Sequence, residues 1–173
     1  MSWIMVDIEA DGPIPGDFSM IEIGAVVVDV VAKDLSHRFS ANLRPISDKL
    51  LPEALAISGY TREQTFAFER PEKVMKEFAE WIAREGGDGP RFISDNNGFD
   101  WMFTCWYFHH FLGKNPFGHS STNLGSFYKG VERNFAKSFK GYRETRHTHK
   151  AVDDAVGNAE AFLAILDRFR VKS

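Results

Sequence analysis

Hydrophobic and polar residues form strand-like patterns in three segments near the start of the chain. Residues 3–9 are mostly apolar and end in acidic residues, residues 20–31 are rich in valine and isoleucine, and residues 37–43 alternate. β-Branched and alternating stretches are typical of strands. The links between the segments are short and carry glycine, proline or charged residues, so we expect antiparallel neighbours in one sheet.

The remainder of the chain is dominated by helical patterns. Pro71 opens a segment with one apolar stripe, and residues 99–112 and 151–169 also predict helices, while Arg91–Ser94 predicts a short strand. Three antiparallel strands followed by alternating helices and strand indicate an α/β fold, with a mixed sheet flanked by helices. Because no repeat or linker divides the sequence, we expect one domain over residues 1–173. The stripe consists of Val74, Phe78, Trp81 and Ile82.

Composition argues against several classes of protein. The formal net charge of -3 is not that of a protein that coats nucleic acid. No apolar run is long enough to cross a bilayer, and the start of the chain lacks the layout of a signal peptide. Cys105 is the only cysteine, so no intramolecular disulfide can form, as is usual in a reducing compartment. We therefore expect a soluble cytoplasmic protein with no membrane contact.

Positive charge is nevertheless concentrated in one segment. Between Lys129 and Lys150, seven basic residues stand against two acidic ones. Such a segment on an otherwise acidic protein indicates a local anion-binding site, although a solvated loop would have the same composition.

Two carboxylates at the end of the first strand are the first candidates for chemistry. Asp7 and Glu9 are two residues apart, so their side chains project from the same face of the strand. Carboxylates crowded together at the end of an apolar strand repel each other, and Mg²⁺ or Mn²⁺ would offset that repulsion. The alternative is that both lie beyond the strand end in water.

Asp100 is a third candidate, because it stands among bulky apolar residues at the start of a helix that follows a strand. It is either an N-terminal cap of that helix or a third carboxylate at a neighbouring strand end. A helical wheel of residues 151–169 supplies a fourth, because it puts Asp154 at the edge of the apolar face and Asp153 on the opposite, solvent-facing side. Four inward carboxylates can hold two cations roughly 4 Å apart, and a nearby histidine can accept a proton from an attacking water.

These residues resemble the three motifs of the DEDDh 3′→5′ exonucleases, a family with the ribonuclease-H-like fold. The motifs are Asp7-Ile8-Glu9, then NNGFD ending at Asp100, then His149 followed by four residues and Asp154. Residues 20–26 (MIEIGAV) and 51–60 (LPEALAISGY) are similar to further segments of that family. Each motif is weak alone, but all three occur in order and at suitable intervals.

The resemblance implies roles for individual residues. Asp7, Glu9, Asp100 and Asp154 would be metal ligands for two divalent cations, Mg²⁺ or Mn²⁺, and His149 would be the general base. His147 has the wrong spacing and is expected in the basic loop. Asn96 matches an asparagine that the family places near the substrate, with a turn residue as the alternative.

Contacts with the substrate are expected from the loop after the first strand and from the basic segment. Phe18 or Met20 would stack on or wedge a base, unless they cap the core, and the backbone of Ala10 would meet the 3′-hydroxyl. Three basic residues would contact phosphates: Lys137, Lys140 and Arg143. Three features depart from the common version of the family. The loop itself differs, Ala10 stands where threonine is frequent, and Asp95 stands where histidine is frequent. These departures bear on substrate choice.

The function implied is a metal-dependent 3′→5′ exonuclease that releases nucleoside 5′-monophosphates from single-stranded RNA or DNA. Residues 10–19 resemble the exoribonuclease branch, which favours RNA. The alternatives are a DNA exonuclease of the proofreading or repair type, a non-catalytic nucleic-acid-binding module and a ribonuclease-H-type endonuclease. A homodimer is implied by family resemblance alone.

Overall fold

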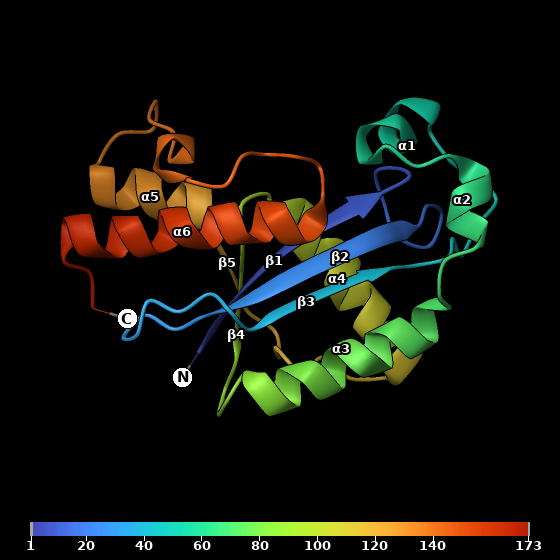
Figure 1. Ribbon diagram of the computed structural model, residues 1–173, viewed down its shortest axis with the longest axis horizontal. Coiled ribbons are helices and arrows are strands. Elements are labelled where there is room, and N and C mark those ends of the chain that lie inside the picture. Colours follow the sequence, from blue (N-terminus) through green and yellow to red (C-terminus); the bar gives the residue numbers. More distant parts are fainter. Residues whose placement is uncertain (1, 173) are drawn as a thin grey trace.

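A five-stranded mixed sheet forms the centre of the fold, with the strand order β3-β2-β1-β4-β5 (Figure 1). The computed structural model describes residues 2–172. β1 (Trp3–Ala10) pairs antiparallel with β2 (Met20–Val28), which pairs antiparallel with β3 (Arg38–Asn42). On its other side β1 pairs in parallel with β4 (Arg91–Ser94), and β4 pairs in parallel with β5 (Ser121–Asn123). The mixed sheet with three antiparallel strands is confirmed.

Helices cover both faces of this sheet (Figure 1). One buried cluster joins β1 to α3 and α4, and a second joins the opposite face to α5 and α6. No helix within residues 2–172 is both long and apolar enough to span a membrane. The helices are α1 (Pro52–Ser58), α2 (Arg62–Phe66), α3 (Pro71–Glu85), α4 (Asn97–Leu112), α5 (Leu124–Glu132) and α6 (Ala151–Phe169), with a 3-10 turn η1 (Lys140–Tyr142).

The alternation along β1 decides which face carries the carboxylates. Val6 and Ile8 lie in the core beneath α3 and α4, whereas Met5 lies in the core beneath α5 and α6. Because successive side chains of a strand point to opposite faces, Asp7 and Glu9 continue the line of Met5. Both carboxylates therefore face the side of the sheet that α6 covers.

Some element boundaries differ from those expected. β2 ends at Val28, not at residue 31, because the Asp29 carboxylate accepts hydrogen bonds from the backbone amides of Val31 and Ala32, each at 2.9 Å, and turns the chain. α4 begins at Asn97, two residues before the expected start. Four elements had no clear pattern in the sequence: α1, α2, β5 and α5.

Candidate active site

The first two carboxylates of the site come from the central strand of the sheet. In β1, Asp7 is opposite Gly24 and Glu9 is opposite Glu22 of β2. The pairing becomes irregular immediately after Glu9, between Glu9 and Ala10, where β1 ends. Both carboxylates are partly buried, and the Glu9 side chain is only 12% exposed. They are therefore not solvated groups beyond the strand end.

Asp100 enters the site from the first turn of α4, which follows β4 directly. It is 2% exposed, and its Oδ2 atom has no hydrogen-bond partner among the described residues. β4 is parallel to β1, so the carboxyl ends of the two strands meet at the same edge of the sheet. Asp100 does not cap α4; Asn96 takes the cap position, and its carbonyl oxygen accepts the Asp100 amide at 3.0 Å.

Asp154 lies in the first turn of α6 and is fully buried, whereas Asp153 is partly exposed, so the helical-wheel prediction is confirmed. Its Oδ1 atom accepts Nη2 of Arg143 at 2.8 Å and the Thr148 amide at 3.2 Å. Its Oδ2 atom accepts the His149 amide at 3.0 Å. Three groups from the preceding loop thus orient this carboxylate.

β2 sets the position of α6, and with it the position of Asp154. The first amide of the helix, that of Ala151, donates to Oε1 of Glu22 at 2.9 Å, which replaces the side-chain cap that Lys150 does not provide. A Cβ atom at Gly24 would lie 2.1 Å from the backbone nitrogen of Val152. Only glycine allows the helix backbone to approach β2 this closely, next to the strand that carries Asp7 and Glu9.

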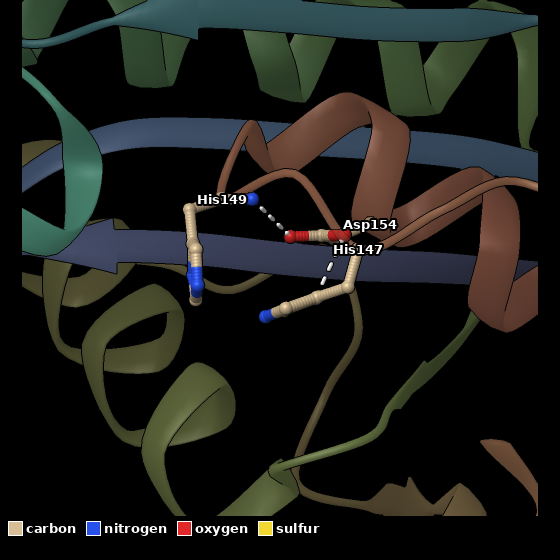
Figure 2. A group of neighbouring side chains, drawn as sticks. All are labelled: His147, His149 and Asp154. Atoms are coloured by element: carbon tan, nitrogen blue, oxygen red, sulfur yellow. Dashed lines mark hydrogen bonds and ion pairs between the residues drawn. The ribbon is translucent and has the colours of Figure 1, made fainter.

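Two histidines lie beside Asp154, and they engage it differently (Figure 2). The Nδ1 atom of His147 is 2.9 Å from Oδ1 of Asp154, while His149 contacts the same carboxylate only through its backbone amide. The His149 ring is directed to Glu9, with 3.8 Å between Nδ1 and Oε1. His147 was expected in the basic loop; it lies in that loop, and its ring also contacts Asp154. The centroids of the two imidazoles are 4.2 Å apart.

The buried carboxylates of the cluster have little positive charge near them, and their pKa values are raised as a result of burial and mutual repulsion. Burial, and next the charge of Glu22, raises the pKa of Glu9 to about 7. Burial raises the pKa of Asp100 to about 8. Burial and then the neighbouring carboxylates raise the pKa of Asp7 well above its usual value, and Arg143 opposes this only in part. A site that makes its carboxylates this basic favours any bound positive charge.

Divalent cations fit this donor set. Oxygen atoms of Asp7, Glu9 and Asp154 all lie within 4.8 Å of one another, and Asp100 adds a buried oxygen that no group of residues 2–172 hydrogen-bonds. Carboxylate oxygens are preferred ligands of Mg²⁺ and Mn²⁺. His147, His149 and Asp154 form a second group with ligand atoms within 4.8 Å, of the kind that softer cations also accept.

An apolar pocket of about 260 Å³ opens next to Glu9. Of the expected contact residues of the neighbouring loop, Ala10 lines the pocket, but Phe18 and Met20 do not: Met20 is fully buried in the core, and the partly buried ring of Phe18 lies over Gly12. Of the two alternatives for Met20, the structure supports the core and not stacking on a base, because the side chain is buried in the cluster between the sheet and α3 and α4. The walls are instead formed by Ala10, Gly12, Pro13, Leu51, Ala54, Ile57 and Phe99.

The three basic residues expected to contact phosphates separate into two groups. Lys137 and Lys140 are exposed, but the Arg143 side chain is only 7% exposed and is paired with Asp154. A Cβ atom at Gly157 would lie 2.6 Å from its Nε atom, so the guanidinium reaches Asp154 across a glycine. Arg143 was predicted to contact a phosphate; instead it is an internal ion-pair partner of Asp154.

Sequence reasoning missed Glu22, Gly24 and Gly157, which position α6 and its carboxylate. Glu22 had a detectable signal, because it is a single charged residue inside the apolar stretch MIEIGAVVV. Gly24 belongs to the family-like segment 20–26, but neither its role nor that of Gly157 had a signal, since each depends on which backbone or side chain passes over the glycine.

The fold and the site together define a class of protein, a ribonuclease-H-like nuclease with four acidic residues and a neighbouring histidine. Comparison with known proteins gives the family. The model of the exonuclease family RNase_T matches residues 4–162, and the chain belongs to this family. The 3′-5′ DNA exonuclease Cap18 of Escherichia coli is 37% identical across 94% of this chain and 90% of its own length.

Solved structures agree on the fold. The nuclease domain of 3′hExo, a DEDDh family member bound to rAMP, has a TM-score of 0.77 at 17% identity, over 96% of this chain and 92% of that one. Cell-death related nuclease 4 (CRN-4) has a TM-score of 0.79 at 16% identity, over 96% of this chain and 64% of that one.

The chain is thus a DEDDh-type 3′→5′ exonuclease with a ribonuclease-H-like fold, as the three motifs predicted. The family uses divalent metal ions, and the E. coli exonuclease I–single-stranded DNA complex is known in a zinc-bound form.

Proposed function

We propose that this exonuclease removes nucleoside 5′-monophosphates one at a time from the 3′ end of single-stranded nucleic acid. The observation that supports the proposal is the convergence of carboxylates from β1, α4 and α6 beside an apolar pocket and two histidines. A phosphodiester at the carboxylates would leave its terminal nucleoside next to that pocket.

Each acidic residue has a role in this proposal. Asp7, Glu9, Asp100 and Asp154 hold two divalent cations, Mg²⁺ or Mn²⁺, which when bound supply activation of the attacking water and stabilisation of the leaving oxygen. His149 is the general base, which accepts the proton of that water. The atom of His149 that accepts this proton is Nε2, because Nδ1 faces Glu9.

The apolar pocket takes the terminal nucleoside. Phe99 and Ile57 offer apolar surface to the base, and Ile57 is 53% exposed. The backbone of Ala10 lies at the pocket wall, where it meets the sugar. The exposed Asn96, adjacent to the site, contacts the terminal phosphate or sugar.

Two observations favour different sugars. Cap18, the relative at 37% identity, is a DNA exonuclease. Residues 10–19, in contrast, resemble the exoribonuclease branch, and RNA therefore stays a prediction. The 2′-hydroxyl distinguishes the two substrates through local contacts at the terminal sugar.

A ladder assay tests the proposal. 5′-Labelled DNA and RNA of matched sequence, single- and double-stranded, are incubated with the protein and Mg²⁺ or with EDTA. We expect products that shorten from the 3′ end of the single strands, release of 5′-monophosphates and no cleavage in EDTA. Internal cuts would indicate an endonuclease, and intact substrates under all conditions would indicate a binding module.

Two neighbouring aspartates provide a matched test of the metal assignment. Asp154→Asn should nearly abolish turnover, because it removes a ligand of the cluster. Asp153→Asn changes the same charge one residue away, outside that cluster, and should leave turnover close to that of the unmodified protein. The reverse order of the two variants would refute the assignment.

A further inference from the structure

An aromatic side chain stands exposed on the loop between α5 and α6. Phe135 is 88% exposed, although it belongs to an ordered turn. α5 ends with Arg133 in the left-handed conformation, and the Asn134 amide closes back on the Lys129 carbonyl at 3.1 Å. The Asn134 side chain then accepts the Ala136 amide at 2.9 Å. The backbone thus holds Phe135 outward, where it buries little of its own surface.

The same turn forms one wall of a hollow lined by lysines. The hollow has a volume of about 320 Å³, and its lining includes Phe135, Lys129, Lys137 and Lys140. The buried Phe139 also contributes to it. An exposed aromatic ring surrounded by ammonium groups offers both stacking and phosphate pairing, which is the combination that single-stranded nucleic acid requires.

The hollow lies at the same edge of the sheet as the carboxylates. Asp95, which follows β4 directly, is part of its lining and is 3.9 Å from Nζ of Lys140. The next residue, Asn96, is the N-cap of α4, which carries Asp100. Gly125, in the first turn of the helix that follows β5, also lines the hollow. Since β1, β4 and β5 are parallel, their carboxyl ends form one continuous edge from the carboxylates to this hollow.

We propose that this hollow is a further nucleotide subsite, which binds the single strand on the 5′ side of the two nucleotides at its 3′ end. Phe135 stacks on a base, and Lys129, Lys137 and Lys140 pair with the phosphates around it. This proposal rests on the exonuclease function proposed above. The subsite makes cleavage depend on substrate length, because only a strand longer than a dinucleotide reaches Phe135.

Steady-state cleavage of a dinucleotide and of a twelve-nucleotide strand tests this subsite, with DNA or RNA according to which the unmodified protein degrades. Phe135→Ser should raise KM for the long strand by about 10-fold or more, as expected for the loss of one stacked base, and leave dinucleotide cleavage unchanged. The control is Val31→Ser, because Val31 is 95% exposed on the turn after β2, away from the hollow. Equal KM values for Phe135→Ser and the unmodified protein, or an equal loss on both substrates, would overturn the subsite.

Direct binding separates this proposal from the proposed function. The affinity for fluorescein-labelled (dT)12 is measured by anisotropy in EDTA, so that no cleavage is needed. Phe135→Ser should bind about 10-fold more weakly, and Lys137→Gln should reduce the slope of log affinity against log salt by about 0.7, the value for one phosphate contact on a single strand. Lys76→Gln on α3 is the control and should change neither quantity. If the unmodified protein cleaves no substrate and these differences in binding are nevertheless found, the subsite stands and the proposed function fails. If Phe135→Ser binds as tightly as the unmodified protein, the subsite fails.

Discussion

His147 and His149 lie side by side next to Asp154, yet different atoms of the two residues contact its carboxylate. The backbone of His149 is in the left-handed region, with a φ of 57°, and this conformation directs its amide to Asp154 while its ring faces Glu9. Asparagine tolerates this conformation better than alanine does. His149→Asn therefore removes the imidazole and preserves the backbone that orients Asp154.

For His149→Asn we predict a loss of turnover of roughly 10²-fold, because proton acceptance by a positioned side chain contributes about that much. Mn²⁺ affinity, measured by calorimetry, should stay close to normal, and the deficit in turnover should shrink at high pH, where hydroxide replaces the base. His147→Asn is the control; it should keep most of its rate at every pH, because the Nδ1 atom of His147 already engages Asp154. Equal losses in the two variants would show that the base is misassigned.

Arg143 is the internal cation nearest to the carboxylates, and its effect on stability should depend on metal ions. Arg143→Gln leaves the buried Asp154 without its ion-pair partner, so we expect the free energy of unfolding in EDTA to fall by about 3 kcal/mol. With Mn²⁺ present the loss should be smaller, because the cation supplies positive charge to the same cluster. Urea denaturation with and without Mn²⁺ measures both values, and Arg146→Gln, an exposed change in the same loop, is the control. An identical loss in both conditions would mean that Arg143 contributes only packing.

At the scale of elements, the approach of α6 to β2 brings the third motif to the first. The helix backbone passes over Gly24, which is opposite Asp7 in the sheet, and Glu22 caps the first turn. One helical turn then places Asp154 next to the carboxylates of β1. The close approach at Gly24 and the hydrogen bond to Glu22 thus fix the start of α6, while the buried cluster between α6 and the sheet holds the rest of the helix.

Gly24→Ala should disrupt this contact. The added Cβ would lie 2.1 Å from a backbone nitrogen, which cannot move aside as a flexible side chain can, so we predict a destabilisation of about 3 kcal/mol or more and a loss of activity in the folded fraction. Gly130→Ala is the control, because that position in α5 is open, and it should be neutral or stabilising by up to about 1 kcal/mol. Urea denaturation and the ladder assay test both variants; normal stability of Gly24→Ala would contradict the close approach.

The free energy of unfolding of the whole molecule should depend on pH in a direction set by the carboxylate cluster. The unfolded chain has carboxyl pKa values of about 4, whereas burial raises those of Glu9 and Asp100 to about 7 and about 8. Between these values the folded protein holds more protons than the unfolded one, so the free energy of unfolding should fall as pH rises from 5.5 to 8.5 in EDTA. Mg²⁺ should reduce this decline, because it compensates the carboxylate charges.

Urea denaturation across this pH range checks the sign. Asp100→Asn removes one of the groups with a raised pKa, so it should flatten the decline in EDTA. A free energy of unfolding that rises with pH in EDTA would show that the cluster does not dominate this range.

The core elements of the fold were readable from local patterns. The strands β1 and β4 are short, largely apolar runs, and the helices α3 and α6 carry apolar stripes with a helical period. The three motifs led directly to Asp7, Glu9, Asp100 and Asp154. β5 was not readable, because its residues Ser-Thr-Asn have no apolar pattern and become a strand only by pairing with β4. Short helices such as α1 and α2 depend in the same way on what they pack against.

What the sequence determined by itself is the identity of the chemical groups and the side of each element that carries them, since both follow from residue type and from periods of two and 3.6 residues. The position of His147 within the site, the internal pairing of Arg143 and the burial of Met20 were decided by tertiary structure alone. Each of these depends on a contact between segments that no local period describes, such as the passage of Arg143 over Gly157. A charged side chain in a loop has the same sequence signature whether it meets water or a buried carboxylate, and only the packing of α6 on the sheet distinguishes the two.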